Sequence, residues 1–162
     1  MIAQPSLYKD YFTNLVATSS SWSTTNITIN SFYFGISRRI IEAQRTLITY
    51  PVMWSSYPSY RLRDNGAQNF TSELRAKIWI ITQRTQDDYN GIDQAMNDMF
   101  SLVNDLLRKM KDDASNSLGQ WCFSTEGLTI SPLEEVFTDY NFGYELNLFI
   151  PNAGFYNVCP LI

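Results

Sequence analysis

Two stretches of the chain alternate apolar and polar residues with a period of two, the pattern of a strand with one buried face. They cover residues 74–82 and 143–150. The positions predicted to point inward are Leu74, Ala76, Ile78 and Ile80 in the first stretch and Tyr144, Leu146, Leu148 and Ile150 in the second. The opposite face of the first stretch mixes cations with aromatic and aliphatic groups, which is unusual for a surface that meets only water.

A different period marks two helices. In residues 88–111, apolar side chains recur every three or four positions, which predicts a helix with one apolar stripe. The stripe consists of Tyr89, Ile92, Met96, Met99, Val103, Leu106 and Met110. A coiled coil fits the same stripe, but one helix packed on a sheet explains it with fewer assumptions. A shorter amphipathic helix is predicted to start at Pro5, and residues 18–26 read as a polar loop.

The remaining segments predict shorter elements. Residues 27–34 and 47–54 have strand composition, and Pro51 places the second of these at a sheet edge or a bulge. Residues 36–45 predict a brief helix, and residues 128–137 a proline-containing connection. The order of elements predicts an α+β fold, an antiparallel sheet of about four to five strands covered on one face by a long amphipathic helix, with an extra N-terminal helix. We expect one domain over residues 1–162, with helix and loop in 1–26, an α+β core in 27–150 and an apolar tail in 151–162.

Charge separates the chain into two parts. Of 162 residues with a net charge of −4, the first 86 carry nine basic and four acidic side chains. The remaining residues carry three basic and twelve acidic side chains. A basic half followed by an acidic half favours charge-complementary contacts with other chains or between copies.

The sequence offers little for catalysis. There is no histidine, so a Ser-His-Asp or Cys-His site cannot form within the chain, and the seven glycines are isolated, so no phosphate-binding loop can be written. Cys122 and Cys159 are too few for a zinc site or a disulfide scaffold and read as free thiols. Paired carboxylates could bind magnesium, but their positions beside a helix start, a helix end and a connection have structural explanations. The pairs are Asp87–Asp88, Asp112–Asp113 and Glu134–Glu135. We therefore expect no enzyme activity, no cofactor and no metal.

Basic residues interleaved with aromatic ones predict an interaction surface. Trp, Tyr and Arg are enriched at protein interfaces. The same types could stack and neutralise a nucleic acid, but the net acidity favours a protein partner. The candidate interface residues are Arg61, Arg63, Arg75, Lys77, Trp79, Trp54, Tyr57, Tyr60, Glu134, Glu135 and Asp139. With no signal peptide and no apolar run near 18 residues, the sequence reads as a soluble protein that is not exported and does not enter membranes.

Four segments together resemble the small neck and tail-completion proteins of tailed bacteriophages, including the tail-terminator group. They are residues 31–35 (SFYFG), 50–54 (YPVMW), 77–89 (a cationic strand leading into a helix that starts with aspartates) and 143–148 (GYELNL). The resemblance lies in architecture and covers roughly residues 27–150. The N-terminal helix and the tail after Pro151 depart from the pattern, and they leave open whether the protein is a terminator, a stopper or another neck ring.

The resemblance implies a non-enzymatic structural virion protein that is assembled in the host cytoplasm. Such proteins form closed rings in the neck or tail, contact adjacent neck or tail proteins, and let DNA pass through the lumen without specific binding. From the charge pattern we expect Arg75 and Lys77 to meet carboxylates from residues 112–145 of a neighbouring copy. The alternatives are a monomeric cytoplasmic protein-binding module and, with less support, a metal-dependent enzyme.

Overall fold

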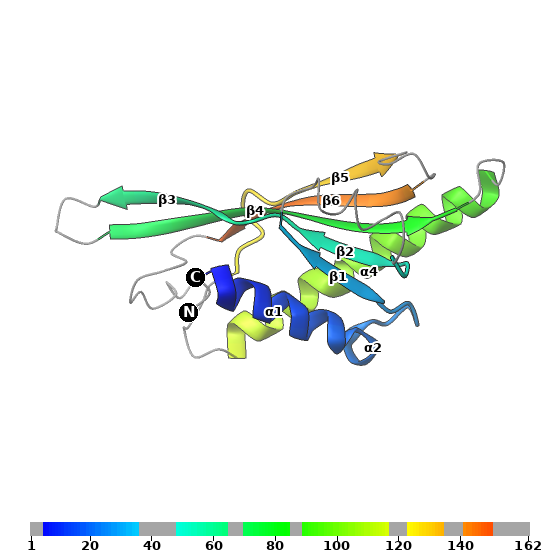
Figure 1. Ribbon diagram of the computed structural model, residues 1–162, viewed down its shortest axis with the longest axis horizontal. Coiled ribbons are helices and arrows are strands. Elements are labelled where there is room, and N and C mark those ends of the chain that lie inside the picture. The colour runs from blue at the N-terminus through cyan, green and yellow to red at the C-terminus, as the bar shows by residue number, and fades with distance from the viewer. Residues whose placement is uncertain are drawn as a thin grey trace.

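The computed structural model describes residues 5–35, 48–64, 70–84, 89–116, 123–134 and 141–150. The side chains of residues 5, 62–64, 70–72 and 134 are not described. The predicted helix over 36–45, the tail 151–162, both cysteines, Glu135 and Asp139 lie outside the described residues. The described chain forms two layers, a twisted six-stranded sheet with helices on one face (Figure 1). This confirms the predicted α+β class and the helix-covered face.

The sheet has the strand order β1-β2-β4-β6-β5, and β3 pairs with β4 outside that path. All pairs are antiparallel except β1 with β2, which is parallel. The predicted antiparallel sheet of about four to five strands is thus confirmed as mostly antiparallel, with one strand more than expected and one parallel pair. The chain between β1 and β2 supplies the dozen or more residues that a parallel crossover needs. The strands are β1 (Ser31–Phe34), β2 (Val52–Ser55), β3 (Ser59–Asp64), β4 (Phe70–Gln83), β5 (Thr129–Glu134) and β6 (Asn141–Ile150).

Strand β4 runs the length of the sheet and pairs with three others. Residues 70–75 pair with β3, residues 78–81 with β2 on the same side, and residues 74–83 with β6 on the opposite side. Both predicted alternations are confirmed, because Leu74, Ala76, Ile78 and Ile80 of β4 and Leu146, Leu148 and Ile150 of β6 are buried against the helices. Tyr144 is only partly buried. Gly143 lets β6 approach β4 closely, since a Cβ there would lie 1.9 Å from the carbonyl oxygen of Ile80.

Strand β3 and the first residues of β4 form a hairpin that extends beyond the rest of the sheet (Figure 1, left). Residues 70–73 pair only with β3 among the strands described. Strand β3 was not predicted, because Tyr60, Arg61 and Arg63 were interpreted as surface chemistry although Tyr60 and Leu62 alternate with the two arginines. We call β3 with residues 70–75 the basic hairpin.

At two prolines, Pro51 and Pro132, the strands differ from the prediction. Strand β2 starts just after Pro51 and lies between β1 and β4, so it is neither an edge strand nor bulged at that proline. Proline has no backbone N–H to donate, but the carbonyl of Pro51 accepts a hydrogen bond from the backbone N–H of Asn30 at 2.8 Å. Residues 129–134, predicted as a connection, form the edge strand β5 with Pro132 inside it. An edge strand tolerates proline because one row of its N–H groups faces away from the ladder.

Helix α4 (Tyr89–Asn116) starts one residue later and ends five residues later than predicted. It packs on β6 and β4, which confirms one helix on a sheet rather than a coiled coil. The predicted stripe is buried at Met99, Val103, Leu106 and Met110. Tyr89, however, is 78% exposed, because the first turns of α4 extend past the end of the sheet (Figure 1, right).

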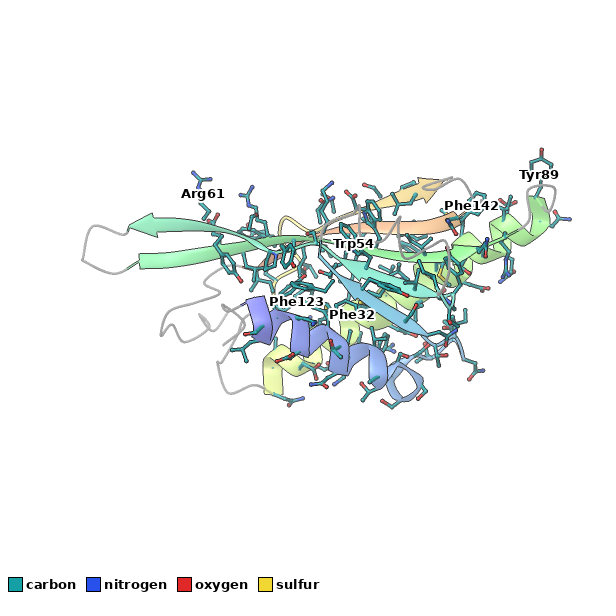
Figure 2. The ribbon with its side chains drawn as sticks, in the orientation of Figure 1. Phe32, Trp54, Arg61, Tyr89, Phe123 and Phe142 are labelled. Atoms are coloured by element: carbon teal, nitrogen blue, oxygen red, sulfur yellow. The ribbon has the colours of Figure 1, made fainter. Side chains whose placement is uncertain are left out.

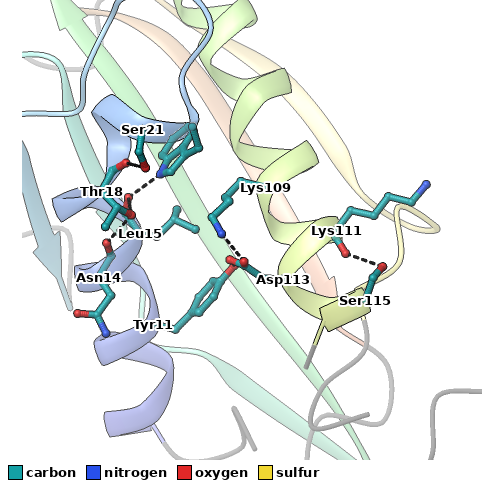
Figure 3. Close-up of polar contacts among 10 residues, drawn as sticks. Tyr11, Asn14, Leu15, Thr18, Ser21, Lys109, Lys111, Asp113 and Ser115 are labelled. Carbon is teal, nitrogen blue, oxygen red and sulfur yellow. Dashed lines mark hydrogen bonds and ion pairs between the residues drawn. The ribbon is translucent and has the colours of Figure 1, made fainter. Parts of the chain in front are cut away.

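Helix α1 (Pro5–Ala17) begins at Pro5 as predicted and lies on the same face as α4, against β1. It buries Tyr8, Phe12, Leu15 and Val16. The hydroxyl of Tyr11 donates to Asp113 of α4 at 3.1 Å, and Lys109 pairs with the same carboxylate (Figure 3). A short helix α2 (Ser19–Trp22) replaces part of the predicted loop, since Trp22 is buried and donates its indole N–H to the carbonyl of Leu15 at 2.9 Å.

Candidate interface on the outer sheet face

The sheet face opposite the helices, here called the outer face, carries the predicted cations and indoles. The register aligns Trp54 of β2, Trp79 of β4 and Glu145 of β6 in one row across three strands. The two indole rings lie 4.5 Å apart between centroids. Trp54 is only 4% exposed and Trp79 is partly buried, so this pair contributes mainly to packing and Trp54 offers almost no surface to a partner.

Glu145 organises the polar groups of this row. Its carboxylate accepts hydrogen bonds from the indole N–H of Trp79 at 2.8 Å and the amide of Asn147 at 3.0 Å. The ammonium of Lys77 lies 3.1 Å from it. Burial raises the pKa of Glu145, but the hydrogen bonds and the Lys77 charge together outweigh it, so the pKa lies below its ordinary value. Lys77, expected to meet a neighbour's carboxylate, is thus paired within its own chain.

Next to this network lies a groove of about 590 Å³. Its walls come from the segment between β2 and β3, from β4, from the turn at Gly127 and from the end of β6. We call it the outer groove. The side chains relevant here are those of Tyr57, Arg75, Lys77, Asn147 and Phe149. The volume falls within the range of sites that bury a small ligand or a few side chains.

Arg75 is the available cation of the outer groove. Its guanidinium lies over the ring of Phe149, 5.6 Å from the centroid, and its side chain is 57% exposed. The nearest carboxylate oxygen belongs to Glu73 at 3.7 Å, beyond hydrogen-bond distance. Among the described residues, the guanidinium donates no hydrogen bond. The ring beneath the guanidinium restricts its orientation.

Tyr57 forms an aromatic wall of the same groove. It is 51% exposed and packs edge-to-face on Phe34, with ring centroids 4.8 Å apart. Gly35 lies beneath the ring with a φ of +131°, a conformation that L side chains rarely adopt. Arg75 and Tyr57, predicted separately from sequence, are thus brought to one site.

The other predicted basic residues lie on the basic hairpin. Arg61 is exposed and shares the outer face with Arg75 by register. Arg63 occupies the next outer position, although its side chain is not described. Tyr60 lies opposite Leu74 on the inner face, and burial raises the pKa of its hydroxyl. Of the predicted acidic candidates, Glu134 ends β5 and its side chain is not described.

An aromatic surface that carries the exposed carboxylate of Asp93 lies at the other end of the molecule, next to Arg84, whose guanidinium donates to the carbonyl of Gly91 at 3.3 Å. Figure 2 shows Arg61 and Tyr89 at opposite ends of the long axis. Over residues 89–107, α4 contains three aspartates and no lysine or arginine. Asp93 is exposed, and no cation lies within ion-pair distance of it in the described part of the chain. Phe100 is also exposed and packs on Tyr144 at 5.4 Å between centroids.

Sequence reasoning missed several residues of these surfaces. The outward-facing positions of β6 could have been predicted from the sequence, because Glu145, Asn147 and Phe149 alternate with its buried residues. Pairing β6 with β4 would have placed them beside Trp79, Lys77 and Arg75. The exposure of Tyr89 could not be predicted from the sequence, since Tyr89 continues the apolar stripe of the helix.

Within the described ranges, no three acidic or cysteine side chains are placed to share a metal ion. None of the helices described combines the length and the apolar character needed to cross a bilayer. The chain matches no protein-family model, and no curated protein has a similar sequence.

Proposed function

We propose that this protein is a non-enzymatic structural subunit that assembles head-to-tail into a closed ring in the neck or tail of a tailed bacteriophage. The observation that carries the proposal is that two chemically different surfaces lie toward opposite ends of the long axis. The basic hairpin carries Arg61 and Arg63 toward one end, with Arg75 and the outer groove at its base. The first turns of α4 present Asp93 and Tyr89 at the other.

The basic hairpin supports an assembly role. Two paired strands without a core beneath them are marginally stable in water. Residues 70–73 pair with β3 alone among the described strands, and the buried core reaches the hairpin only at its base, at Leu74. A contact with a neighbouring subunit would bury this hairpin and stabilise it.

Two different surfaces at opposite ends also suit cyclic assembly. A heterologous contact, in which one patch meets a different patch on the next copy, generates a ring when the rotation closes. The place in the virion, the adjacent neck or tail proteins and the DNA that passes without specific binding come from the sequence resemblance. That resemblance is to proteins without catalytic residues, so the proposed role needs no cofactor.

The native mass of the purified protein tests the proposal. We expect a discrete oligomer, a multiple of 18.7 kDa, that appears as a ring in electron micrographs. Arg61→Glu with Arg63→Glu should shift the mass toward the monomer at moderate salt. Lys9→Glu with Lys111→Glu, which changes the same charge on exposed helix positions, is the matched control and should keep the oligomer.

The second candidate is a monomeric protein-binding module that uses the outer groove for a protein ligand. The exposed Arg75 and Tyr57 favour it as much as they favour a subunit contact. A protein that stays at 18.7 kDa at all concentrations and with its partners would support this module and refute the ring.

A further inference from the structure

We propose that the outer groove of one copy receives the start of α4 from the next copy, with Asp93 as the carboxylate that binds Arg75. This inference rests on the proposed ring and names the contact that closes it. It differs from the sequence expectation, which placed the neighbour's carboxylates within residues 112–145.

Arg75 has the geometry of a carboxylate receptor. Its exposed guanidinium lies over Phe149 and forms a long ion pair with Glu73 at 3.7 Å, beyond hydrogen-bond distance, so its N–H groups can still form paired hydrogen bonds with a closer carboxylate. Lys77 is less suitable, because its ammonium already pairs with Glu145 at 3.1 Å. Of the two cations that line the groove, Arg75 therefore has the longer ion pair, 3.7 Å to Glu73 against 3.1 Å from Lys77 to Glu145.

The start of α4 has the complementary chemistry. Tyr89, Asp93 and Phe100 are spaced four and seven residues apart, so they lie along one stripe of the helix. All three are exposed, and Asp93 has no cationic partner among the described residues. The stripe thus offers one carboxylate between two aromatic rings, and the groove offers one guanidinium between Tyr57 and Phe149.

The placement of the two surfaces makes the contact possible only between copies. The start of α4 extends past one end of the sheet (Figures 1 and 2), whereas Arg75 lies at the base of the basic hairpin, between Ser59 of β3 and Phe149 of β6. Neither surface can reach its complement within one chain. Each copy therefore keeps one free groove and one free helix start, so the contact propagates from copy to copy until the ring closes.

Four samples test the inference: Arg75→Glu, Asp93→Arg, the double variant that carries both changes, and an equimolar mixture of the two single variants. Each is measured by sedimentation velocity beside the wild type. Both positions are exposed, and a far-ultraviolet circular dichroism spectrum and melting temperature like those of the wild type confirm folding. Asp98→Arg is the control on the same helix, because residue 98 lies on the opposite side of α4 from the stripe.

Each single variant should weaken association at least tenfold, since it places like charges at a close interfacial contact. The double variant should restore the oligomer. The mixture should also restore the oligomer, with the two variants alternating, because the intact Asp93 of the first variant meets the intact Arg75 of the second and the two substituted side chains are opposite in charge as well. Asp98→Arg should assemble as the wild type does.

The outcomes separate this inference from the proposed function. If the wild type forms rings and both single variants still form them, the Arg75–Asp93 contact is wrong and the ring stands. If both single variants are monomeric but the mixture stays monomeric and the double variant is not rescued, the two residues are not partners. A wild type that remains monomeric at every concentration refutes the ring and the contact together.

Discussion

Replacing Asp105 by Asn is expected to destabilise the protein although the residue is far from the proposed contacts. Asp105 lies on α4 and is almost fully buried. Its carboxylate accepts the backbone N–H of Thr24 at 2.6 Å, the hydroxyl of Thr24 at 2.8 and 2.9 Å, and the guanidinium of Arg108 at 2.8 Å. This carboxylate therefore ties the loop after α2 to the long helix.

The side-chain amide of asparagine has one acceptor oxygen where the carboxylate has two, and its NH₂ group would face a hydrogen-bond donor. At least one of the donors around position 105 then loses its acceptor. A hydrogen bond to a charged group contributes about 1.5–3 kcal/mol, and a buried unsatisfied donor costs about 1–3 kcal/mol. We expect Asp105→Asn to lower the free energy of unfolding by about 2 kcal/mol, which corresponds to a melting temperature about 4–8 °C lower for a chain of this size.

Urea unfolding at neutral pH, followed by circular dichroism at a concentration where the protein is monomeric, measures this change. The matched control is Asp112→Asn, an exposed position on the same helix, which should stay within about 0.5 kcal/mol of wild type. In a double-mutant cycle with Thr24→Val, the two changes should be non-additive by about 0.5–3 kcal/mol. An Asp105→Asn protein as stable as the control would refute the role assigned to this carboxylate.

Two further predictions concern groups described above. The pKa of Glu145 is depressed by folding, so its carboxylate stabilises the fold above the ordinary glutamate value of about 4.3 and this contribution is lost as the pH falls through the folded-state pKa. Between about pH 5 and pH 3, the free energy of unfolding of Glu145→Gln should therefore fall less than that of the wild type. Parallel plots of unfolding free energy against pH for the two proteins would contradict this. Tyr8→Phe removes the hydroxyl that lies 2.8 Å from Ser55 Oγ in the core and should cost about 1 kcal/mol in urea unfolding, whereas an unchanged midpoint would show that the pair contributes nothing.

The sequence was informative where burial and periodicity coincide. The alternations around Ile78 and Leu146 and the stripe of α4 were read correctly, because each buries one face against another layer. Strands β3 and β5 were not predicted, since β3 extends beyond the other strands and β5 carries a proline at a sheet edge. Local composition could not predict either strand, because each depends on where the strand lies within the sheet.

The candidate site was predicted in part. The types Arg, Lys, Trp and Tyr on β4 and near β3 indicated an interaction surface, and the structure gathers Arg75, Lys77 and Tyr57 around one groove. The sequence could not distinguish an available cation from an engaged one. That distinction between Arg75 and Lys77 depends on Glu145, which reaches Lys77 through strand register across 68 residues of chain.

The continuous path of β4 has a mechanical consequence. A strand of 14 residues spans about 45 Å and joins the basic hairpin to the end of the sheet beside the start of α4 without a break in the backbone. A force applied at the hairpin therefore loads the hydrogen bonds to β6 and β2 in shear, all together rather than one after another. In a ring whose subunits are joined through these two ends, tension around the circumference would pass along this one strand in each copy.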